Sequence, residues 1–137
     1  MPGELTHADL FELFGGQGFV ATCRTMAPVL RSALKAATAS DITVLLEGET
    51  GTGKQVLAHA IHNLDHKRNA FPFVTVHCST IGQELAESEL FGHRRGAFSG
   101  ATYEREGLFP AANQGTLFLD DVNDLPLALQ PKLLDVL

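Results

Sequence analysis

The sequence predicts an α/β fold in three layers, with helices on both faces of a parallel β-sheet. Three apolar runs, at 42–46, 73–76 and 116–119, have the length and composition of buried strands. Helical patterns, with apolar residues three and four positions apart, lie between these runs. Strands that alternate with helices along a chain pair in parallel, because each helix carries the chain back to the end of the sheet at which the previous strand began.

The N-terminal part contains two predicted helices. Residues 15–18, which are rich in glycine, end the first, whose apolar face would consist of Leu5, Leu10, Leu13 and Phe14. The second runs from Met26 to about Ala37 and ends at Ser40 and Asp41, just before the first expected strand.

A glycine-rich stretch at 48–54 follows that strand and precedes a helix predicted at 54–64. Glycines allow successive backbone N–H groups to converge on one concave site, and the start of the helix presents its free N–H groups to the same point. Lys54 adds a full positive charge for the β- and γ-phosphates of a nucleotide. The position after it, where a Ser or Thr usually holds Mg²⁺ through its hydroxyl, is a glutamine. The stretch predicts a phosphate-binding loop made of Gly48, Glu49, Thr50, Gly51, Thr52, Gly53, Lys54 and Gln55.

The histidines and cysteines give weaker signals. A metal site would fit the spacing of three and four positions between His59, His62 and His66. Half-buried helix positions explain that spacing better, because no Cys or acidic partner stands at a suitable distance in sequence. Cys23 and Cys78 form neither a disulfide framework nor a metal-binding spacing. Cys78 follows a strand and is expected to be a buried free thiol.

Polar residues follow the second and third expected strands. His77 ends the second, and Asp120 and Asp121 end the third. Acidic residues at the carboxyl end of a buried strand lie beside the phosphate loop in such sheets. Asp120 therefore suits Mg²⁺, and Asp121 suits the positioning of a water molecule. A solvated acidic turn is the other interpretation, because Asp124 is close in sequence.

Three further helical segments are expected around these strands. Ser79 or Thr80 would cap a helix that continues to Phe91. A short helix or turn is predicted over 107–113. The last helix, over 125–137, accommodates a proline in its first turn and would direct inward Leu133, Leu134 and Leu137.

Residues 92–101, with the sequence GHRRGAFSGA, surround the aromatic Phe98 with small residues and glycines. An ordinary surface loop is one interpretation. The other is a partner-binding loop, because an aromatic at the tip of a glycine-hinged loop often anchors a partner protein.

The composition bounds the partners and the compartment. The net charge of −6 provides no basic field that would attract nucleic acid. The sequence contains no signal peptide and no apolar stretch of membrane length, so we expect a cytoplasmic protein without membrane contact.

Three motifs occur in order: GETGTGK at 48–54, ESELFGHRRGAFSGA at 87–101 and GTLFLDDVNDLPLALQPKLL at 115–134. Together they closely resemble the central AAA+ ATPase domain of bacterial enhancer-binding proteins, the activators of sigma-54 RNA polymerase. The resemblance covers residues 19–137 and leaves 1–18 as an N-terminal segment. Its most specific part is the GAFSGA loop, in which Ser99 replaces the usual Thr and keeps the hydroxyl. It implies an α/β P-loop NTPase fold of the AAA+ type.

The resemblance also implies a mechanism. Subunits form a ring, usually a hexamer, and hydrolyse ATP with Mg²⁺ at their interfaces. Residues 48–55 would bind the nucleotide, Asp120 would serve the metal and Asp121 would orient the attacking water. The nucleotide state would move the GAFSGA loop. The loop would then engage sigma-54 in the RNA polymerase holoenzyme through Gly96, Ala97, Phe98, Ser99, Gly100 and Ala101.

Three residues depart from the family's pattern, and all three stand at positions that the resemblance assigns to nucleotide binding or hydrolysis. Gln55 replaces the usual Glu, His77 stands where an Asn couples the catalytic carboxylate to the loop, and Asp121 stands where the family has Glu. The catalytic residues that the resemblance implies are Lys54, His77 and Asp121. Asp is shorter than Glu by roughly 1.5 Å, and a misplacement of about 1 Å can cost on the order of a hundredfold in rate. We therefore expect nucleotide binding to be better preserved than hydrolysis.

The family's domain continues with another core strand, a polar sensor, arginine fingers and a helical lid, and a separate domain binds DNA. The next strand would lie between the first and third strands expected here. The resemblance therefore implies the N-terminal part of the domain only, with an incomplete sheet, inactive by itself. Two other functions stay open. One is a catalytically silent nucleotide-binding or interaction module. The other is an AAA+ ATPase that remodels a different protein, which the GAFSGA sequence disfavours.

Overall fold

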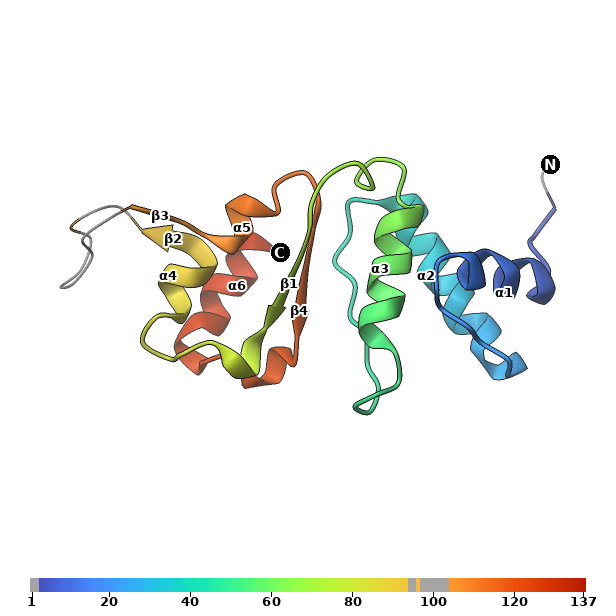
Figure 1. The fold of residues 1–137 in the computed structure, drawn as a ribbon, viewed down its shortest axis with the longest axis horizontal. Coiled ribbons are helices and arrows are strands. Elements are labelled where there is room, and N and C mark those ends of the chain that lie inside the picture. The colour runs from blue at the N-terminus through green and yellow to red at the C-terminus, as the bar shows by residue number, and fades with distance from the viewer. Residues whose placement is uncertain (1–2, 94–95, 97–103) are drawn as a thin grey trace. The chain divides into compact units, whose positions relative to one another are not determined.

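The computed structural model describes residues 3–93, 96 and 104–137, and the chain forms two compact units, 1–70 and 71–137 (Figure 1). The first unit contains α1 (His7–Gly16), α2 (Ala27–Ala39) and α3 (Lys54–Leu64), with a 3-10 turn at Arg24–Met26. The helices of the second unit are α4 (Ala86–Phe91), α5 (Leu108–Ala111) and α6 (Gln130–Val136). Its strands are β1 (Phe73–His77), β2 (Gly92–His93), β3 (Arg105–Glu106) and β4 (Thr116–Asp120). Single 3-10 turns lie at Cys78–Thr80, Val122–Asp124 and Leu127–Leu129.

One apolar cluster holds the three helices of the first unit together. Leu10 and Phe14 of α1 are fully buried, and they pack with the inward faces of α2 and α3 in a cluster completed by Leu30, Ala33, Leu57 and Ala60. All three helices were predicted, because apolar residues at helical spacing must be buried against a neighbouring element. The helix after the glycine-rich loop has the bounds that the sequence indicates.

A buried carboxylate ties the end of α2 to the end of α3. Asp65 is only 5% exposed. Its oxygens accept hydrogen bonds from the Ser40 hydroxyl, at 2.9 and 2.8 Å, and from the backbone N–H of Lys67, at 2.9 Å. Ser40 ends α2 with a positive φ of 66°. This network therefore fixes the point from which the chain leaves toward the glycine-rich loop.

The strand expected at 42–46 does not form, and that prediction is wrong. These residues have no regular secondary structure, and the strands that the structure describes all belong to the second unit. Ile42, Val44 and Leu45 are 54%, 42% and 70% exposed. An apolar run becomes a strand only when a neighbour pairs with its N–H and C=O groups. No described residues provide that ladder here.

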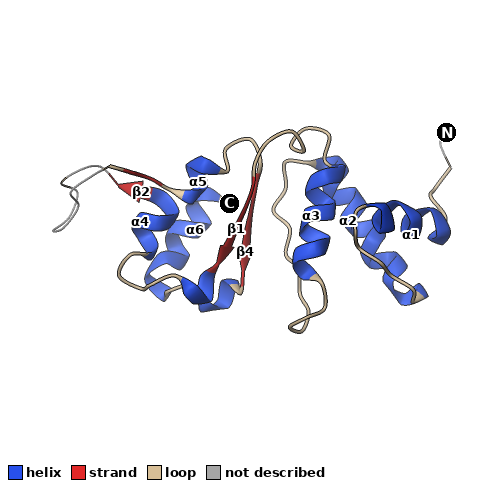
Figure 2. Cartoon of the chain, in the orientation of Figure 1, coloured by secondary structure: helices blue, strands red, loops and turns tan. Residues whose placement is uncertain are grey.

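The second unit is built on a parallel strand pair, as predicted. β1 pairs with β4 in the register Phe73 with Thr116 through His77 with Asp120. The long connection between them passes through α4, the antiparallel β2–β3 pair and α5. Figure 2 shows α4, α5 and α6 gathered beside the β1–β4 pair. The core between them consists of Val76, Cys78, Ala86, Leu90, Leu125, Leu129 and Leu133.

Two local predictions in this unit are wrong. Neither Ser79 nor Thr80 caps α4, whose N-cap is Leu85 without a side-chain hydrogen bond. The chain makes a 3-10 turn directly after β1, in which the Thr80 hydroxyl donates to the backbone carbonyl of His77 at 2.8 Å. In α6, Leu133 is buried as expected, but the residues that remain exposed, at 73% and 61%, are Leu134 and Leu137.

Candidate functional site

The glycine-rich loop has the backbone conformation that an anion-binding turn needs. Gly51 and Gly53 adopt left-handed φ angles of 81° and 91°, which side chains with a Cβ disfavour. Gly53 is the N-cap of α3, and no side chain caps the first turn of that helix. The free N–H groups of this turn and the positive end of the helix dipole therefore point toward the loop.

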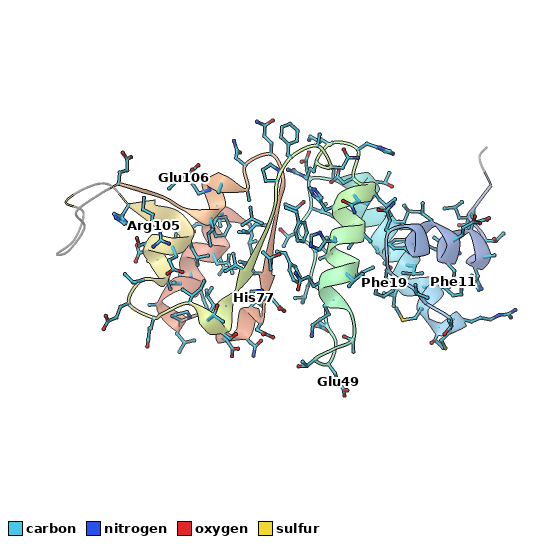
Figure 3. All side chains as sticks on the ribbon, in the orientation of Figure 1. Phe11, Phe19, Glu49, His77, Arg105 and Glu106 are labelled. Carbon is cyan, nitrogen blue, oxygen red and sulfur yellow. The ribbon has the colours of Figure 1, made fainter. Side chains whose placement is uncertain are left out.

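Lys54 is the first residue of α3, and its side chain turns back over the loop. The Nζ atom donates to the carbonyl oxygens of Gly48, at 2.5 Å, and Glu49, at 3.3 Å. The Thr52 hydroxyl donates to the same Glu49 carbonyl at 2.7 Å. Glu49 itself lies at the exposed tip of the loop (Figure 3). The positive charge of Lys54 thus lies against the backbone of the glycine-rich loop.

The close fit of the loop explains its first glycine. A Cβ added to Gly48 would lie 2.9 Å from the Thr52 hydroxyl oxygen. Thr50 and Gln55 are exposed. The geometry of the first unit therefore agrees with phosphate binding in the loop, and Gln55 brings no hydroxyl to it.

The polar end of the parallel sheet lies in the second unit. Asp120 is the last residue of β4, and Asp121 follows it with a left-handed φ of 54°. His77 ends β1 (Figure 3), and its Nδ1 atom lies 3.3 Å from Oδ2 of Asp120. The side chain of Asp120 is 24% exposed and that of His77 is 52% exposed. The structure thus brings His77 to Asp120, a contact that the sequence did not predict.

The carboxylates at this end of the sheet also act on a buried thiol. Burial raises the pKa of Cys78, and the negative charges of Asp120, Asp121 and Asp124 raise it further. Cys78 is 1% exposed, which confirms the expected buried thiol. A surface depression beside it is lined by Ser79 and Asp124, among other residues. Asp121 and Asp124 are exposed, so this end of the sheet presents negative charge to solvent.

The end of β4 offers few potential metal ligands. Within the part of the chain that the structure describes, no three His, Cys, Asp or Glu side chains are grouped to hold a metal ion. Asp120 offers a carboxylate oxygen at the carboxyl end of a strand, and the imidazole of His77 stands beside it.

The histidines of α3 do not form a metal site in the described ranges. His62 is 5% exposed and lies in the helix, whereas His59 and His66 are exposed. The other candidate segment is the GAFSGA loop. Gly96 is exposed, with a φ of 81°, and Ala97 through Ala101 lie outside the described residues.

The stem of this loop, which we define as β2 and β3, was missed by the sequence analysis. Gly92 of β2 has a φ of 76°, and a Cβ there would lie 2.5 Å from the backbone oxygen of Arg105 in β3. The Ser88 hydroxyl forms a hydrogen bond with Nδ1 of His93. The sequence feature that could have predicted this stem is the pair of glycines at 92 and 107. Without side chains there, the two ends of the loop can approach each other closely.

Across the described ranges, every helix is too short or too polar to pass through a lipid bilayer.

Comparison with known proteins shows that the chain is similar to one part of several transcription regulators. The family described as the Sigma-54 interaction domain matches residues 19–137. The nitric oxide reductase transcription regulator NorR2 of Cupriavidus necator is 49% identical over 98% of this chain, which corresponds to 25% of that protein. The sigma54-dependent transcriptional activator SfnR of Pseudomonas putida is 52% identical over 95% of this chain and 32% of its own length. The chain thus spans about a quarter to a third of these two relatives.

Solved structures agree with this result. NtrX from Brucella abortus, crystallised in complex with ATP, has 32% sequence identity and a TM-score of 0.73, over 86% of this chain and 24% of its own. NtrX in complex with ADP has 29% identity and the same TM-score of 0.73, over 94% of this chain and 27% of its own. The α/β fold of the P-loop NTPase class, in its AAA+ form, is thereby confirmed.

Proposed function

This chain belongs to the sigma-54 interaction domain family, and we propose that it binds ATP and couples its hydrolysis to the remodelling of sigma-54 RNA polymerase. The observation that carries the proposal is the loop at 48–54. Its two left-handed glycines, its uncapped helix start and its inward-turned Lys54 form a receptor for polyphosphate. NtrX, which has a similar structure, was crystallised with ATP.

The proposed roles follow from the chemistry of each group. Residues 48–55 bind the phosphates, and Lys54 exchanges its two carbonyl contacts for phosphate oxygens. Asp120 holds Mg²⁺, which neutralises charge on the phosphates when it is bound. Asp121 orients the attacking water molecule. His77 holds the carboxylate of Asp120 in position through the contact of its Nδ1 atom.

The partner surface is the GAFSGA loop. Gly96 through Ala101 contact sigma-54, with Phe98 as the apolar anchor and Ser99 as the hydroxyl donor or acceptor. The β2–β3 stem connects the loop to α4, against which both strands pack. The AAA+ domain covers residues 19–137. Subunits assemble through this domain into a hexameric ring in the cytoplasm. The net charge of −6 provides no basic field for DNA on these 137 residues.

The first experiment tests nucleotide binding. The full chain is titrated with a fluorescent ATP analogue, beside Lys54→Ala and a control, Lys35→Ala, in which an exposed lysine of α2 is removed. Hydrogen bonds to charged groups contribute about 1.5–3 kcal/mol, so Lys54→Ala should weaken binding roughly ten- to hundredfold. Equal affinity of wild type and Lys54→Ala contradicts the proposal.

The second experiment tests the partner. Sigma-54 is used to capture the protein in the presence of a trapped ATP analogue, and Phe98→Ala serves as the comparison. Capture that depends on the analogue and is lost in Phe98→Ala supports the proposal. If capture of sigma-54 depends on the nucleotide but is unchanged in Phe98→Ala, Phe98 is not the anchor and the GAFSGA loop is not the partner surface.

A second function, a catalytically silent nucleotide-binding module, has one observation in its favour. The imidazole of His77 contacts Asp120, the proposed metal residue, at 3.3 Å. In the family pattern this position couples the water-orienting carboxylate to the loop. Phosphate release separates the two functions, because the silent module binds ATP and captures sigma-54 without producing phosphate.

A further inference from the structure

A left-handed glycine at the start of α3 sets the direction of the N–H groups in the phosphate loop. Gly53 is the N-cap of α3, with a φ of 91° and a ψ of 23°. Glycine populates positive and negative φ with similar ease, so nothing in the residue itself holds this conformation. Rotation about ψ would turn the peptide group that carries the N–H of Lys54. A neighbouring group must therefore keep the backbone of Gly53 in place.

The side chain of Phe19 lies against this glycine (Figure 3). Its ring atoms Cε2 and Cδ2 are 3.3 and 3.9 Å from the position that a Cβ of Gly53 would occupy. In a glycine one α-hydrogen points to that position, so the ring covers one side of the Gly53 backbone. Close packing on that side restricts the rotation of φ and ψ.

Phe19 is held in turn by α1. Gly18, with a left-handed φ of 87°, turns the chain after this helix. The backbone N–H of Phe19 then donates to the carbonyl oxygen of Phe14 at 2.9 Å. Phe14 is fully buried in the apolar cluster of the first unit, to which Leu57 of α3 also belongs. The helix α1 thus fixes the position of Phe19, although it lies before the residues 19–137 that the family matches.

We propose that Phe19, held by α1, is a positioning residue of the phosphate loop, and that it raises the affinity for polyphosphate by restricting Gly53 to its left-handed conformation. The inference rests on the proposed function, in which this loop binds the phosphates of ATP. Releasing the backbone of one residue should weaken polyphosphate binding roughly five- to thirtyfold, because that residue must be ordered again when the ligand binds. The effect acts on the phosphates, so a ligand without a base should show it as fully as ATP does.

The test separates an effect on the loop from an effect on the base and from a loss of stability. ATP and inorganic tripolyphosphate each displace a fluorescent ATP analogue from the full chain, with a chelator present. The variants are Phe19→Ala and Phe19→Leu, the second of which keeps an apolar side chain in the cluster without the ring. The matched control is Phe11→Ala, because Phe11 is another half-buried phenylalanine that packs against the same cluster (Figure 3). Melting curves of all four proteins show that each is folded at the temperature of the titration.

Nuclear magnetic resonance of the α-hydrogens of Gly53 gives a second readout, which does not depend on affinity. The field of an aromatic ring displaces the resonance of a hydrogen that lies against it. One α-hydrogen of Gly53 should therefore be displaced in wild type and in Phe11→Ala, and should return toward the ordinary glycine value in both Phe19 variants.

Both Phe19 variants should bind ATP and tripolyphosphate roughly five- to thirtyfold more weakly, and Phe11→Ala should bind them as wild type does. A folded Phe19 variant that keeps its affinity for tripolyphosphate overturns this inference alone, and so does an equal loss in Phe11→Ala. If wild type does not bind the ATP analogue, or if tripolyphosphate does not displace it, the polyphosphate receptor of the proposed function is wrong instead.

Discussion

Asp121 is shorter by one methylene than the glutamate that the resemblance to the family implies at this position. Its backbone is left-handed, with a φ of 54° and a ψ of 50°, and its side chain is exposed. Adding one methylene moves the carboxylate by roughly 1.5 Å. Because a displacement of about 1 Å can change the rate on the order of a hundredfold, Asp121→Glu should raise ATP turnover by one to two orders of magnitude.

Phosphate release at saturating ATP measures this change. Asp124→Glu is the matched control, since Asp124 is an exposed aspartate three positions further along. Combining Asp121→Glu with His77→Asn tests whether the neighbouring side chain limits the gain. Turnover that stays at the wild-type value in both variants would show that the length of this side chain is not the limit.

The two cysteines should react very differently with an alkylating reagent. Hydrogen bonds with Thr25 lower the pKa of the exposed Cys23 thiol. Burial and nearby carboxylates raise the pKa of Cys78. The thiolate is the reactive form, so a lower pKa increases its population near neutral pH and a higher pKa reduces it.

We expect iodoacetamide to modify Cys23 first, with Cys78 protected until the second unit unfolds. Mass spectrometry after timed reaction, with and without denaturant, gives both rates. Raising the pH should accelerate Cys23 until its lowered pKa is passed, and then have little further effect. Equal rates for the two thiols in the native chain would contradict the burial of Cys78.

Individual residues show where sequence reasoning stops. The chemistry of Lys54, Asp120 and Cys78 followed from residue type and the position after a strand or loop. The contact of His77 with Asp120 did not, because it depends on the register of two strands that lie 43 positions apart in sequence. Residue spacing along the chain carries no information about that register.

At the level of elements, α1 depends on a capping box. The Thr6 hydroxyl accepts from the backbone N–H of Asp9 at 3.2 Å, and Oδ2 of Asp9 accepts from the backbone N–H of Thr6 at 2.8 Å. Replacing a Thr at this position by Ala typically costs about 1 kcal/mol. Thr6→Ala should therefore lower the melting temperature of the first unit by several degrees, as followed by circular dichroism. Thr22→Ala, in an exposed connection, is the control.

This contribution should depend on pH in a defined direction. The hydrogen bonds of Thr6 lower the pKa of Asp9 in the folded state. A lowered folded pKa means that the stabilisation is fully present above the unfolded value of about 3.9 and is lost as the pH falls through the folded value. The difference between wild type and Thr6→Ala should thus be constant near neutral pH and shrink below about pH 4. A difference that grows on acidification would contradict the capping geometry.

The stem of the GAFSGA loop should tolerate no side chain at Gly92. Its φ is 76°, and a Cβ would lie 2.5 Å from the Arg105 backbone oxygen and 2.7 Å from the Gly107 nitrogen. Gly92→Ala must therefore separate β2 from β3. We expect capture of sigma-54 to fall about as far as in Phe98→Ala, with ATP affinity unchanged.

Gly82→Ala is the matched control for the stem, because a Cβ at Gly82 meets nothing within 4 Å. Sigma-54 capture and fluorescent-nucleotide titration are measured on the same samples. A Gly92→Ala protein that captures sigma-54 as wild type does would remove the stem from the proposed coupling.

Elements differ in how far the sequence predicts them. The helix α3 has the expected bounds, since its glycine-rich start and its apolar face are both local features. The run at 42–46 has the composition of a buried strand, yet it forms none. A helix satisfies its own backbone groups, whereas a strand takes half of its definition from a neighbour. In α6, Leu134 is exposed although its residue type predicted burial, because burial of a side chain requires another element to pack against it.

For the whole molecule, the division into two units separates two tasks. The proposed phosphate loop with Lys54 belongs to residues 1–70, and the aspartates proposed to bind the metal and to orient water belong to residues 71–137. Affinity for the phosphates should therefore depend on the first unit. The effect of divalent cations, and turnover with it, should depend on the second.

The variant Asp120→Ala tests this division. In the presence of a chelator, its affinity for ATP should match wild type within about twofold, because Lys54 and the loop amides are unchanged. Divalent cations should strengthen ATP binding by wild type but not by Asp120→Ala, since the variant lacks the proposed metal ligand. Lys54→Ala should show the opposite pattern, with weak binding under both conditions.

Isothermal titration with a chelator, with Mg²⁺ and with Mn²⁺ gives three affinities for each variant. Asp124→Ala removes a neighbouring exposed carboxylate and should behave as wild type. Loss of affinity in Asp120→Ala with the chelator present would contradict this division, because the carboxylate would then be needed for phosphate binding without a metal. A cation effect that survives in Asp120→Ala would instead assign the metal to another group, of which His77 is the first to examine because it lies 3.3 Å away.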